Sequence, residues 1–497
     1  MKYILDSREA KAADAATIQY FGVPSPVLME RAALTVVEEI EKRYPGADSF
    51  LIVCGSGNNG GDGFAAARLL FLEGHRVVVA FVGNENKMSA DGAMQLAIVR
   101  KYGIPVISEI PEENFDVVLD GVFGIGLSRD VAGHYAEVIR QMNEKTGIKV
   151  AIDISSGINA DDGRVMGTAF RADLTVTFGF AKRGHLLYPG ASYAGELVVT
   201  EIGIDEVSLR GLVPPVKMLE EKDLALLPAR RADTNKGSYG KVLVIAGSVN
   251  MAGAAYFSAS AAYRTGAGLV RVLTPEENRV IIQSTVPEAV LTTYNSGSFE
   301  KGKVLDCLAW ADAIVLGPGL GTGEVSAKIV ETVLSEADCP CVVDADALNL
   351  AAERHFRPGK TGPLRILTPH PGEMARLCGC SVKEVKDSLL ETALSYAKEQ
   401  GVILVLKDAH TVTALPDGTA YINASGNNGM ATGGSGDVLA GVIAGLLAQG
   451  CTPETAAPLG VYVHGLAGDA AAERYGKYGM TASDLAAGIP EVLKKTE

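Results

Sequence analysis

The sequence predicts an α/β protein with two sheets of parallel strands. Its 497 residues exceed the roughly 100–200 residues of an ordinary domain, so we expect two large domains. In each half, short apolar runs rich in β-branched residues alternate with amphipathic or alanine-rich segments. Such runs are typical of strands that helices cover on both faces, and ligands of these sheets bind at the carboxyl ends of the strands.

The first half opens with a helical segment, residues 7–44, which the two prolines of Gly22-Val-Pro-Ser-Pro26 divide. Five predicted strands of a doubly wound sheet follow, namely Phe50–Cys54, Arg76–Val82, Asp116–Asp120, Val150–Asp153 and Leu174–Phe178. The segment Gly211–Pro215 ends in two prolines, which favour a stiff, extended connector. It predicts two domains, residues 1–213 and 217–497.

The second half restarts the same pattern. Its predicted strands are Lys241–Ala246, Leu269–Leu273, Ala313–Leu316, Cys341–Asp344, Arg365–Thr368 and Val402–Leu406. Polar or glycine-rich segments follow five of them, namely Gly247-Ser248, Gly317–Gly321, Asp344–Asn349, Thr368–Glu373 and Lys407–Thr411. Their place after strands predicts a binding site at one edge of the sheet. Taken singly, His370 is also explained by a capped turn and Lys407 by a solvated strand end.

Composition argues against several classes of function. The 45 basic and 59 acidic residues give a net charge of −14, which disfavours sequence-independent binding to nucleic acid or to an anionic membrane. The longest apolar runs, such as Val438–Ala448, are shorter than the roughly 18 residues that span a bilayer. The first residues lack the apolar core of a signal peptide, so we expect a cytoplasmic protein. Seven cysteines, an odd number, do not indicate a disulfide framework, and the Cys-x-Cys pairs lack the usual spacing of zinc ligands.

The most informative motif runs from Asn427 to Asp437 and leads directly into the apolar, helix-forming residues Val438–Ala448. Its four glycines allow backbone N–H groups to approach phosphate oxygens, and the helix dipole favours their negative charge. Asp437 could take a proton from a hydroxyl group that attacks a terminal phosphoryl group. The motif therefore predicts phosphoryl transfer or closely related chemistry, although such a turn also occurs as simple punctuation before a helix.

Three loops of the first half carry a second set of candidates. The strand that ends at Cys54 leads into Gly55–Gly63, which is not a G-x-G-x-x-G motif but supplies amide and carboxylate oxygens for ribose hydroxyls or a monovalent cation. The alternative for this loop is an Asx-rich turn that bonds only to itself. Asp120 begins a glycine loop whose Arg129 suits a phosphate or pyrophosphate, and Asp153 and Ser156 follow the next strand. All three loops should meet at one rim of the sheet.

Together these motifs resemble, across nearly the whole chain, the bifunctional NAD(P)H-hydrate repair enzymes. In that family a Rossmann-like epimerase domain precedes a ribokinase-like, ADP/ATP-dependent dehydratase domain. The residues that carry the resemblance are Leu28-Met-Glu-Arg-Ala32, Gly57-Asn-Asn-Gly-Gly-Asp-Gly63, Asp120-Gly-Val-Phe-Gly-Ile-Gly126, Asp153-Ile-Ser-Ser-Gly157, Gly317-Pro-Gly-Leu-Gly321, Thr368-Pro-His-Pro-Gly-Glu373 and Gly433-Gly-Ser-Gly-Asp-Val-Leu-Ala-Gly441. The resemblance implies repair of NADH and NADPH that have been hydrated across the 5,6 bond of the nicotinamide ring (NADHX and NADPHX).

For the first domain, the resemblance implies interconversion of the R and S epimers at C6. The residues implied to hold the hydrated dinucleotide are Asn58, Asn59, Gly60, Gly61, Asp62, Gly124, Ile125, Gly126, Leu127, Ser128, Arg129, Asp130 and Asp153. Asn59, Asp120 and Ser156 are implied to bind K⁺. Asp153 contacts the ring in this interpretation and is the candidate acid or base.

For the second domain, the resemblance implies phosphorylation of the C6 hydroxyl of the S epimer by ADP or ATP, followed by loss of phosphate. The residues implied to face the hydrate are Ala254, Gly319, His370 and Asp437, and those implied to face the nucleotide are Lys407, Asp408, Ala409, His410, Thr411 and Gly436. Glu373 is the candidate to hold Mg²⁺ through water. Asp408 departs from the small residue expected there, so either its carboxylate points away from the phosphates or nucleotide affinity is reduced.

Two other functions fit part of the pattern. A kinase for small alcohols would share the Gly-Ser-Gly-Asp motif, and accumulation of a stable phosphorylated product would identify it. The first domain could instead be a binding or scaffold module, against which the carboxylates of Asp120 and Asp153 argue. We expect a homo-oligomer that uses neither nucleic acid nor a membrane, and the choices between ADP and ATP and between NADHX and NADPHX stay open.

Overall fold

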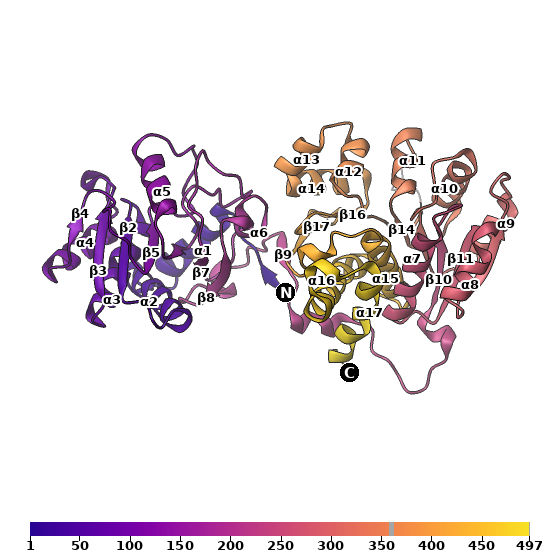
Figure 1. Ribbon diagram of the computed structural model, residues 1–497, viewed down its shortest axis with the longest axis horizontal. Helices are drawn as coiled ribbons and strands as arrows, with labels where there is room; N and C mark the ends of the chain where they lie inside the picture. The colour runs from indigo at the N-terminus through magenta and orange to yellow at the C-terminus, as the bar shows by residue number, and fades with distance from the viewer. Residues whose placement is uncertain (357–361, 497) are drawn as a thin grey trace. The chain divides into compact units, whose positions relative to one another are not determined.

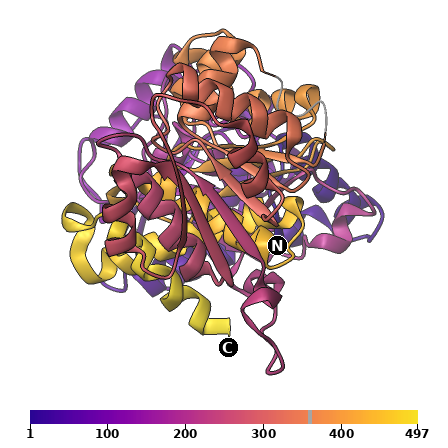
Figure 2. The same ribbon diagram turned by 90° about the vertical axis from the view of Figure 1, so that its right-hand side faces the viewer.

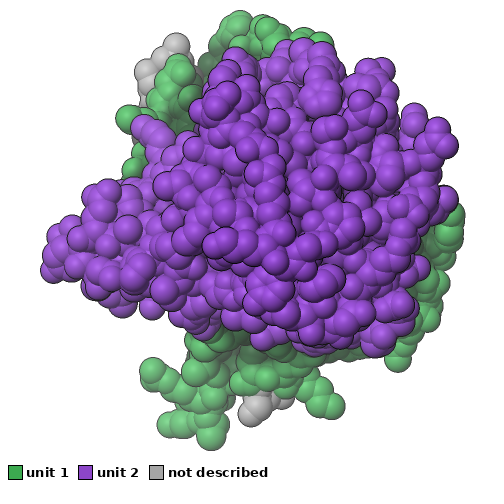
Figure 3. Space-filling model, turned by 90° about the vertical axis from the view of Figure 1, so that its left-hand side faces the viewer, with its two compact units in different colours: residues 1–2, 215–497 green, residues 3–214 purple. Residues whose placement is uncertain are grey.

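The computed structural model describes residues 1–356 and 362–496, and the chain divides into two compact units (Figures 1 and 3). The N-terminal unit comprises residues 3–214, and the C-terminal unit comprises residues 1–2 and 215–497. Each unit contains a sheet of mainly parallel strands flanked by helices, which confirms the predicted α/β fold class. Within the described ranges, no helix is both long and apolar enough to cross a membrane.

The N-terminal sheet has seven parallel strands in the order β4-β3-β2-β5-β6-β7-β8. Their bounds are Ser49–Cys54 (β2), Arg76–Phe81 (β3), Val106–Ile107 (β4), Val117–Gly121 (β5), Ile148–Ile152 (β6), Leu174–Phe178 (β7) and Glu196–Thr200 (β8). The chain order reverses beside β2, because β3 pairs with one of its edges and β5 with the other. Ligand sites of open α/β sheets lie at such a reversal.

Alternate residues of β2 belong to different hydrophobic cores, as expected for a doubly wound sheet. Phe50, Ile52 and Cys54 pack with residues of α2, α3 and α4, whereas Leu51 and Val53 pack with residues of α5. The helices of this unit are Ser7–Gln19 (α1), Ser25–Arg43 (α2), Asn58–Leu72 (α3), Ala90–Lys101 (α4), His134–Glu144 (α5) and the short Arg183–Leu186 (α6). These two layers fix the strand ends that carry the polar loops.

Helix α3 begins at Asn58, six residues before the helical segment that the sequence predicts from Phe64. The glycines of its first turn allow this early start. A Cβ atom at Gly60 would lie 2.1 Å from the carbonyl oxygen of Gly55, and one at Gly63 would lie 2.8 Å from Sγ of Cys54. The Asn-Asn-Gly-Gly-Asp motif is therefore a helix start packed tightly on β2, and not a separate loop.

The C-terminal sheet has eleven strands in the order β1-β9-β18-β17-β16-β15-β14-β13-β10-β11-β12. They are Lys2–Tyr3 (β1), Val216–Met218 (β9), Lys241–Ile245 (β10), Leu269–Pro275 (β11), Val290–Tyr294 (β12), Ala313–Leu316 (β13), Cys341–Val343 (β14), Arg365–Leu367 (β15), Ile403–Leu406 (β16), Thr411–Ala414 (β17) and Ala420–Asn423 (β18). Strands β10 to β16 are parallel, whereas β17 is antiparallel to both β16 and β18. The segment that begins with Lys407 is thus the connection between β16 and β17.

Helices cover both faces of this sheet (Figures 1 and 2). Four of them, Ala252–Thr265 (α7), Ser435–Ala448 (α15), Pro453–Gly479 (α16) and Ala482–Leu493 (α17), share one core with the strands. The others are Arg279–Thr285 (α8), Lys301–Leu308 (α9), Glu324–Glu336 (α10), Asp346–Arg354 (α11), Pro371–Cys378 (α12), Val382–Asp387 (α13) and Leu389–Gln400 (α14). Figure 1 shows α11 to α14 on the opposite side of the sheet from α15 to α17.

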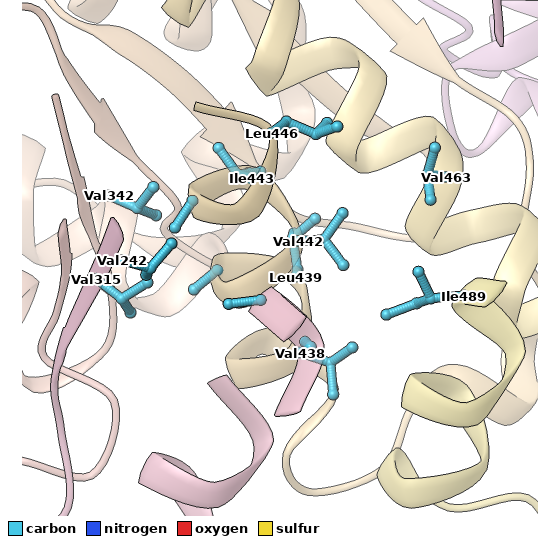
Figure 4. Close-up of a cluster of buried hydrophobic side chains, with 14 of the residues drawn as sticks. Val242, Val315, Val342, Val438, Leu439, Val442, Ile443, Leu446, Val463 and Ile489 are labelled. Atoms are coloured by element: carbon cyan, nitrogen blue, oxygen red, sulfur yellow. The ribbon is translucent and has the colours of Figure 1, made fainter. Parts of the chain in front are cut away.

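Helix α15 is the central element of this core. All eleven residues from Val438 to Ala448 are buried, so the helix is apolar around its whole circumference, as is typical of a helix enclosed by protein. Its side chains lie between strand residues such as Val315 and the helix residues Val463 and Ile489 (Figure 4). This packing holds the amino end of α15, where Asp437 lies, in a fixed position relative to the strand ends.

We predict that Gly441→Ala destabilises the C-terminal unit by ~1–3 kcal/mol, the usual effect of overpacking a well-filled core. A Cβ atom at Gly441 would lie 2.3 Å from the carbonyl oxygen of Ser258 on α7. Denaturant unfolding followed by fluorescence of Trp310, the one tryptophan of the sequence, reports on this unit. The matched control is Gly302→Ala in α9, where a Cβ atom meets nothing within 4 Å. Equal stability of the two variants would contradict the close packing of α15 on α7.

Candidate active sites

A cavity of about 1060 Å³ lies in the N-terminal unit, at the carboxyl ends of its strands. Its wall combines the loop after β2 and the start of α3 with the glycine loop after β5, the end of β6 and parts of α1 and α2. The predicted residues that line it are Asn58, Asn59, Asp62, Gly124, Ile125, Gly126, Leu127, Ser128, Arg129, Asp130 and Asp153. Gly60 and Gly61 do not line it, because they are buried inside the first turn of α3.

Asp120 and Ser156 form a buried pair that does not belong to the cavity wall. The Asp120 carboxylate accepts hydrogen bonds from the Ser156 N–H (2.7 Å), the Ser156 hydroxyl (2.6 Å) and the Val122 N–H (3.1 Å). Burial raises the pKa of Asp120 to about 6, although these three hydrogen bonds oppose the shift. Nearby, the buried Asn59 side chain has an Nδ2 without a hydrogen-bond partner. The group is rich in oxygen atoms and carries an uncompensated negative charge when Asp120 ionises.

Asp153 bonds to two residues that the sequence interpretation missed, Lys182 and Thr177. The Lys182 ammonium donates to Oδ1 of Asp153 (2.6 Å) and to Oγ1 of Thr177 (2.7 Å), and the Thr177 hydroxyl donates to the same Oδ1 (2.8 Å). Burial alone would raise the pKa of Asp153, but the charge and hydrogen bond of Lys182, helped by Thr177, hold it below its usual value. Lys182 follows β7 and lines the cavity, so the rule that polar residues after strands build the site could have identified it.

Two further carboxyl groups line the same cavity, those of Asp14 on α1 and Asp62 on α3. Burial, reinforced by the negative charge of Asp153, raises the pKa of both, and that of Asp62 lies well above its usual value. The carboxyl groups are therefore shifted in opposite directions, with the pKa of Asp153 below its usual value and that of Asp62 well above it.

In the C-terminal unit, Asp437 lies in the first turn of α15. The helix begins directly after Gly434, whose φ of 93° is in the left-handed region that favours glycine. Burial raises the pKa of Asp437 to about 7, and the negative charge of Asp344 adds to the shift while Lys407 opposes it. A carboxyl group with this pKa is poised to exchange a proton at neutral pH.

Lys407 is a partner of Asp344 and not a solvated strand end. Its Nζ lies 2.8 Å from Oδ1 of Asp344, which also accepts a hydrogen bond from the Thr368 hydroxyl at 2.8 Å. The Asp344 side chain is 2% exposed. A Cβ atom at Gly436 would lie 3.2 Å from Nζ of Lys407, so the ammonium group rests against the first turn of α15. The sequence singled out the Asp344 segment but did not predict this pair.

The glycine loop after β13 is fixed next to Asp344 and Asp346. A Cβ atom at Gly317 would lie 2.1 Å from the carbonyl oxygen of Asp344, and the Gly321 N–H donates to Oδ2 of Asp346 (2.8 Å). Gly319 faces Ala254 on α7, since a Cβ atom at Gly319 would lie 2.8 Å from that of Ala254. Ala254 and Gly319, both predicted to face the substrate, are thus adjacent.

His370 caps α12, as the simpler sequence interpretation proposed. The ring Nδ1 of His370 accepts a hydrogen bond from the backbone N–H of Gly372 (3.0 Å), and the backbone N–H of His370 donates to Oε2 of Glu373 (2.8 Å). The His370 side chain is nevertheless 52% exposed, so capping leaves one side of the ring accessible. The carboxylate of Asp408 accepts from the N–H of Ala409 and lies 3.7 Å from Nζ of Lys386, so it is already engaged within its own surroundings.

His464, which the sequence left as a structural residue, contacts the glycine motif itself. Its Nε2 lies 3.0 Å from the carbonyl oxygen of Ser435 at the start of α15. Burial lowers the pKa of His464 to about 4, so the ring is neutral and donates this hydrogen bond. His464 therefore positions the turn that presents Asp437.

Comparisons with known proteins match both units. The family described as NAD(P)H-hydrate dehydratase matches residues 242–491, and the family described as YjeF-related protein N-terminus matches residues 25–184. A bifunctional NAD(P)H-hydrate repair enzyme from Moorella thermoacetica is 39% identical over 100% of this chain and 97% of its own length. The corresponding enzyme from Escherichia coli is 36% identical over 94% of this chain and 89% of its own. The crystal structure of an ADP/ATP-dependent NAD(P)H-hydrate dehydratase from Bacillus subtilis, co-crystallised with ATP and Mg²⁺, is 36% identical, with a TM-score of 0.51, and covers 57% of this chain and 100% of its own.

We predict that Lys407→Met destabilises the C-terminal unit by ~3–5 kcal/mol, because it leaves the buried Asp344 carboxylate without its cation. Trp310 fluorescence during denaturant unfolding measures the loss. The control is Lys383→Met, which removes an exposed lysine of α13 and should stay within about 0.5 kcal/mol of the unchanged protein. If Lys407→Met were as stable as this control, the ion pair of Lys407 with Asp344 would not hold the site in place.

Proposed function

The chain belongs to the family of bifunctional NAD(P)H-hydrate repair enzymes, and from this membership we propose which reaction each of its two sites catalyses. The family combines an epimerase for the R and S forms of hydrated NAD(P)H with an ADP/ATP-dependent dehydratase for the S form. In our proposal the N-terminal cavity is the epimerase site, and the strand ends around Asp437 are the dehydratase site.

The observation that carries the dehydratase proposal is the pKa of Asp437, which is about 7 at the amino end of a glycine-led helix. Asp437 takes the proton of the C6 hydroxyl as this oxygen attacks the terminal phosphoryl group, and the N–H groups of the glycine turn face the phosphate oxygens. Loss of phosphate from C6 then restores the reduced ring. Ala254, Gly319 and His370 face the hydrate, and Lys407–Thr411 and Gly436 face the nucleotide.

Mg²⁺ would accompany the nucleotide phosphates, whose negative charge it neutralises. The residue proposed to hold it, through water, is Glu373, whose carboxylate is 6% exposed and lies among the charged groups of Lys407 and Asp437. The proposal also includes a homo-oligomer, which light scattering would test.

The epimerase proposal rests on the size and polarity of the N-terminal cavity. Its volume, about 1060 Å³, is at the upper end of the roughly 300–1,000 Å³ of small-molecule sites, as a dinucleotide requires. Arg129 and Lys11 both line the cavity and supply cations for the pyrophosphate. Nζ of Lys11 lies beside the glycine loop after β5, 4.0 Å from where a Cβ atom at Gly126 would lie. Asp153 supplies an ionised carboxylate beside the ring.

Potassium fits the group formed by Asn59, Asp120 and Ser156. Asp120 is a fully buried carboxyl group whose pKa is raised by burial, while hydrogen bonds from Ser156 and Val122 oppose the rise. The buried amide of Asn59 has an unpaired polar atom nearby. A bound monovalent cation would neutralise Asp120 and stabilise the glycine loop after β5.

We predict that Asp437→Asn retains nucleotide binding but loses roughly 10²–10⁴-fold in dehydration of the S hydrate, the usual effect of removing a general base. The absorbance of reduced nicotinamide measures the reaction. In the unchanged protein the rate should fall tenfold per pH unit below about pH 7, because protonation then removes the base. The control is Asp338→Asn at an exposed position. A rate within threefold of the control would refute the assignment of Asp437.

We further predict that R-to-S exchange by the unchanged protein is faster in K⁺ than in Li⁺ buffer, and that Asp120→Asn abolishes this difference. The substitution removes the charge that a cation would balance while preserving the shape of the side chain. Dehydration of pure S hydrate serves as the internal control and should be unchanged. Equal exchange rates in the two buffers for the unchanged protein would exclude potassium from the site.

A further inference from the structure

We propose that Lys182 is a catalytic residue of the epimerase site, which donates a proton to the C6 hydroxyl as that group leaves the hydrated ring. The inference rests on the placement of the hydrated ring in the N-terminal cavity proposed above. It adds a proton donor to a site in which Asp153 is the candidate acid or base from the sequence.

The position of Lys182 is the first argument. Its side chain is 5% exposed, yet the residue lines the cavity, so the ammonium group is held in protein and adjoins the space for a ligand. Two of its N–H groups make short hydrogen bonds to Asp153 and Thr177. The third contact, to the carbonyl oxygen of Phe178, is 3.4 Å, longer than the usual 2.7–3.2 Å. One N–H therefore remains available for a substrate oxygen.

The state of Asp153 is the second argument. Its Oδ1 accepts from both Lys182 and Thr177, and these bonds favour the ionised form. An ionised carboxylate has no proton to give to a leaving hydroxyl. Its charge instead stabilises a cationic ring, and Oδ2, which accepts from neither Lys182 nor Thr177, is left to receive a proton.

The backbone provides a third argument. Asp153 has a φ of 63°, in the left-handed region where a residue with a side chain is strained. This turn at the end of β6 directs the carboxylate to the lysine that follows β7. The N–H of Lys182 is held in turn by Nδ1 of His185, which burial and the charge of Lys182 keep neutral, with a pKa of about 3. Both partners are thus fixed from the backbone.

The proton transfers of this reaction balance without a further reactant. Lys182 Nζ gives a proton to the C6 hydroxyl, the C6–O bond breaks as water leaves, and the lone pair of the ring nitrogen forms the iminium double bond. Water then adds to the opposite face of C6, and its proton passes to Asp153. The contact between Asp153 and Lys182 returns this proton to the amine, which restores the starting state with C6 inverted.

The competing donor is Asp62, which also lines the cavity and whose pKa is raised well above its usual value by burial and by the charge of Asp153. Unlike Lys182, it makes no hydrogen bond to Asp153 in the described structure, so no direct path returns a proton to it. Lys182 is therefore the better connected of the two. Asp62→Asn provides the experimental comparison.

The test is the rate of R-to-S exchange with R hydrate supplied alone, coupled to dehydration by the other site of the same chain. Lys182→Met should lower kcat at least 100-fold, with KM within about threefold, while dehydration of pure S hydrate is unchanged. Lys182→Arg should be equally slow, because a guanidinium group preserves the ion pair with Asp153 but does not release its proton. The control, Lys101→Met at an exposed position of α4, should match the unchanged protein.

Chemical rescue separates lost chemistry from lost structure. Methylamine added to Lys182→Ala should restore exchange at least tenfold, and should not affect Asp153→Ala. Exchange by Lys182→Arg within threefold of the unchanged protein would overturn the proposal, since charge alone would then suffice. So would a larger loss in Asp62→Asn than in Lys182→Met. If the unchanged protein did not accelerate exchange at all, the assignment of the epimerase site itself would fail.

Discussion

In both units a lysine ammonium group forms a largely buried ion pair with an aspartate at the end of a strand. Lys182 lies 2.6 Å from Asp153, and Lys407 lies 2.8 Å from Asp344. Buried ion pairs of this kind contribute little net stability compared with apolar residues, because both charges lose their hydration. Their consequence here is electrostatic. Each fixed negative charge raises the pKa of a neighbouring carboxyl group, Asp62 in one unit and Asp437 in the other. Carboxyl groups whose pKa values are driven apart can act as acid and base at the same pH.

The parallel sheets make these pairs possible. In each unit the two partners follow different strands, β6 and β7 for Asp153 and Lys182, and β14 and β16 for Asp344 and Lys407. The strands themselves are almost wholly apolar and are covered on both faces, so polar side chains become frequent only where the strands end. Glycines at these ends allow the backbone to approach, as Gly317 does at the carbonyl oxygen of Asp344. The fold therefore concentrates charge at one edge of each sheet.

Sequence patterns predicted the class of fold and most central strands, because buried parallel strands appear as uninterrupted β-branched runs. They missed edge strands such as β4, β8 and β12, whose residues are mostly only partly buried. The candidate carboxylates Asp120 and Asp153 were predictable because they lie at the ends of predicted strands, and Asp437 because it follows a glycine motif at the start of a predicted helix. The pairing of carboxylates with lysines was not predicted, since 29 residues separate Asp153 from Lys182 and 63 separate Asp344 from Lys407. Spacing along the chain does not say which strand ends become neighbours.

The contacts among Asp437, Asp344 and Lys407 explain the role of the glycine motif at the start of α15. A general base is most effective when its pKa is near the working pH, and an ordinary aspartate, at about 3.9, is too weak a base at pH 7. Burial and Asp344 raise the pKa of Asp437, and Lys407 limits the rise. Lys407 can act on both carboxylates only because it rests against the first turn of the helix. A Cβ atom at Gly436 would lie 3.2 Å from its Nζ, so the ammonium group would have to shift by a few tenths of an ångström. The glycine thus allows the ammonium group to lie against the start of the helix.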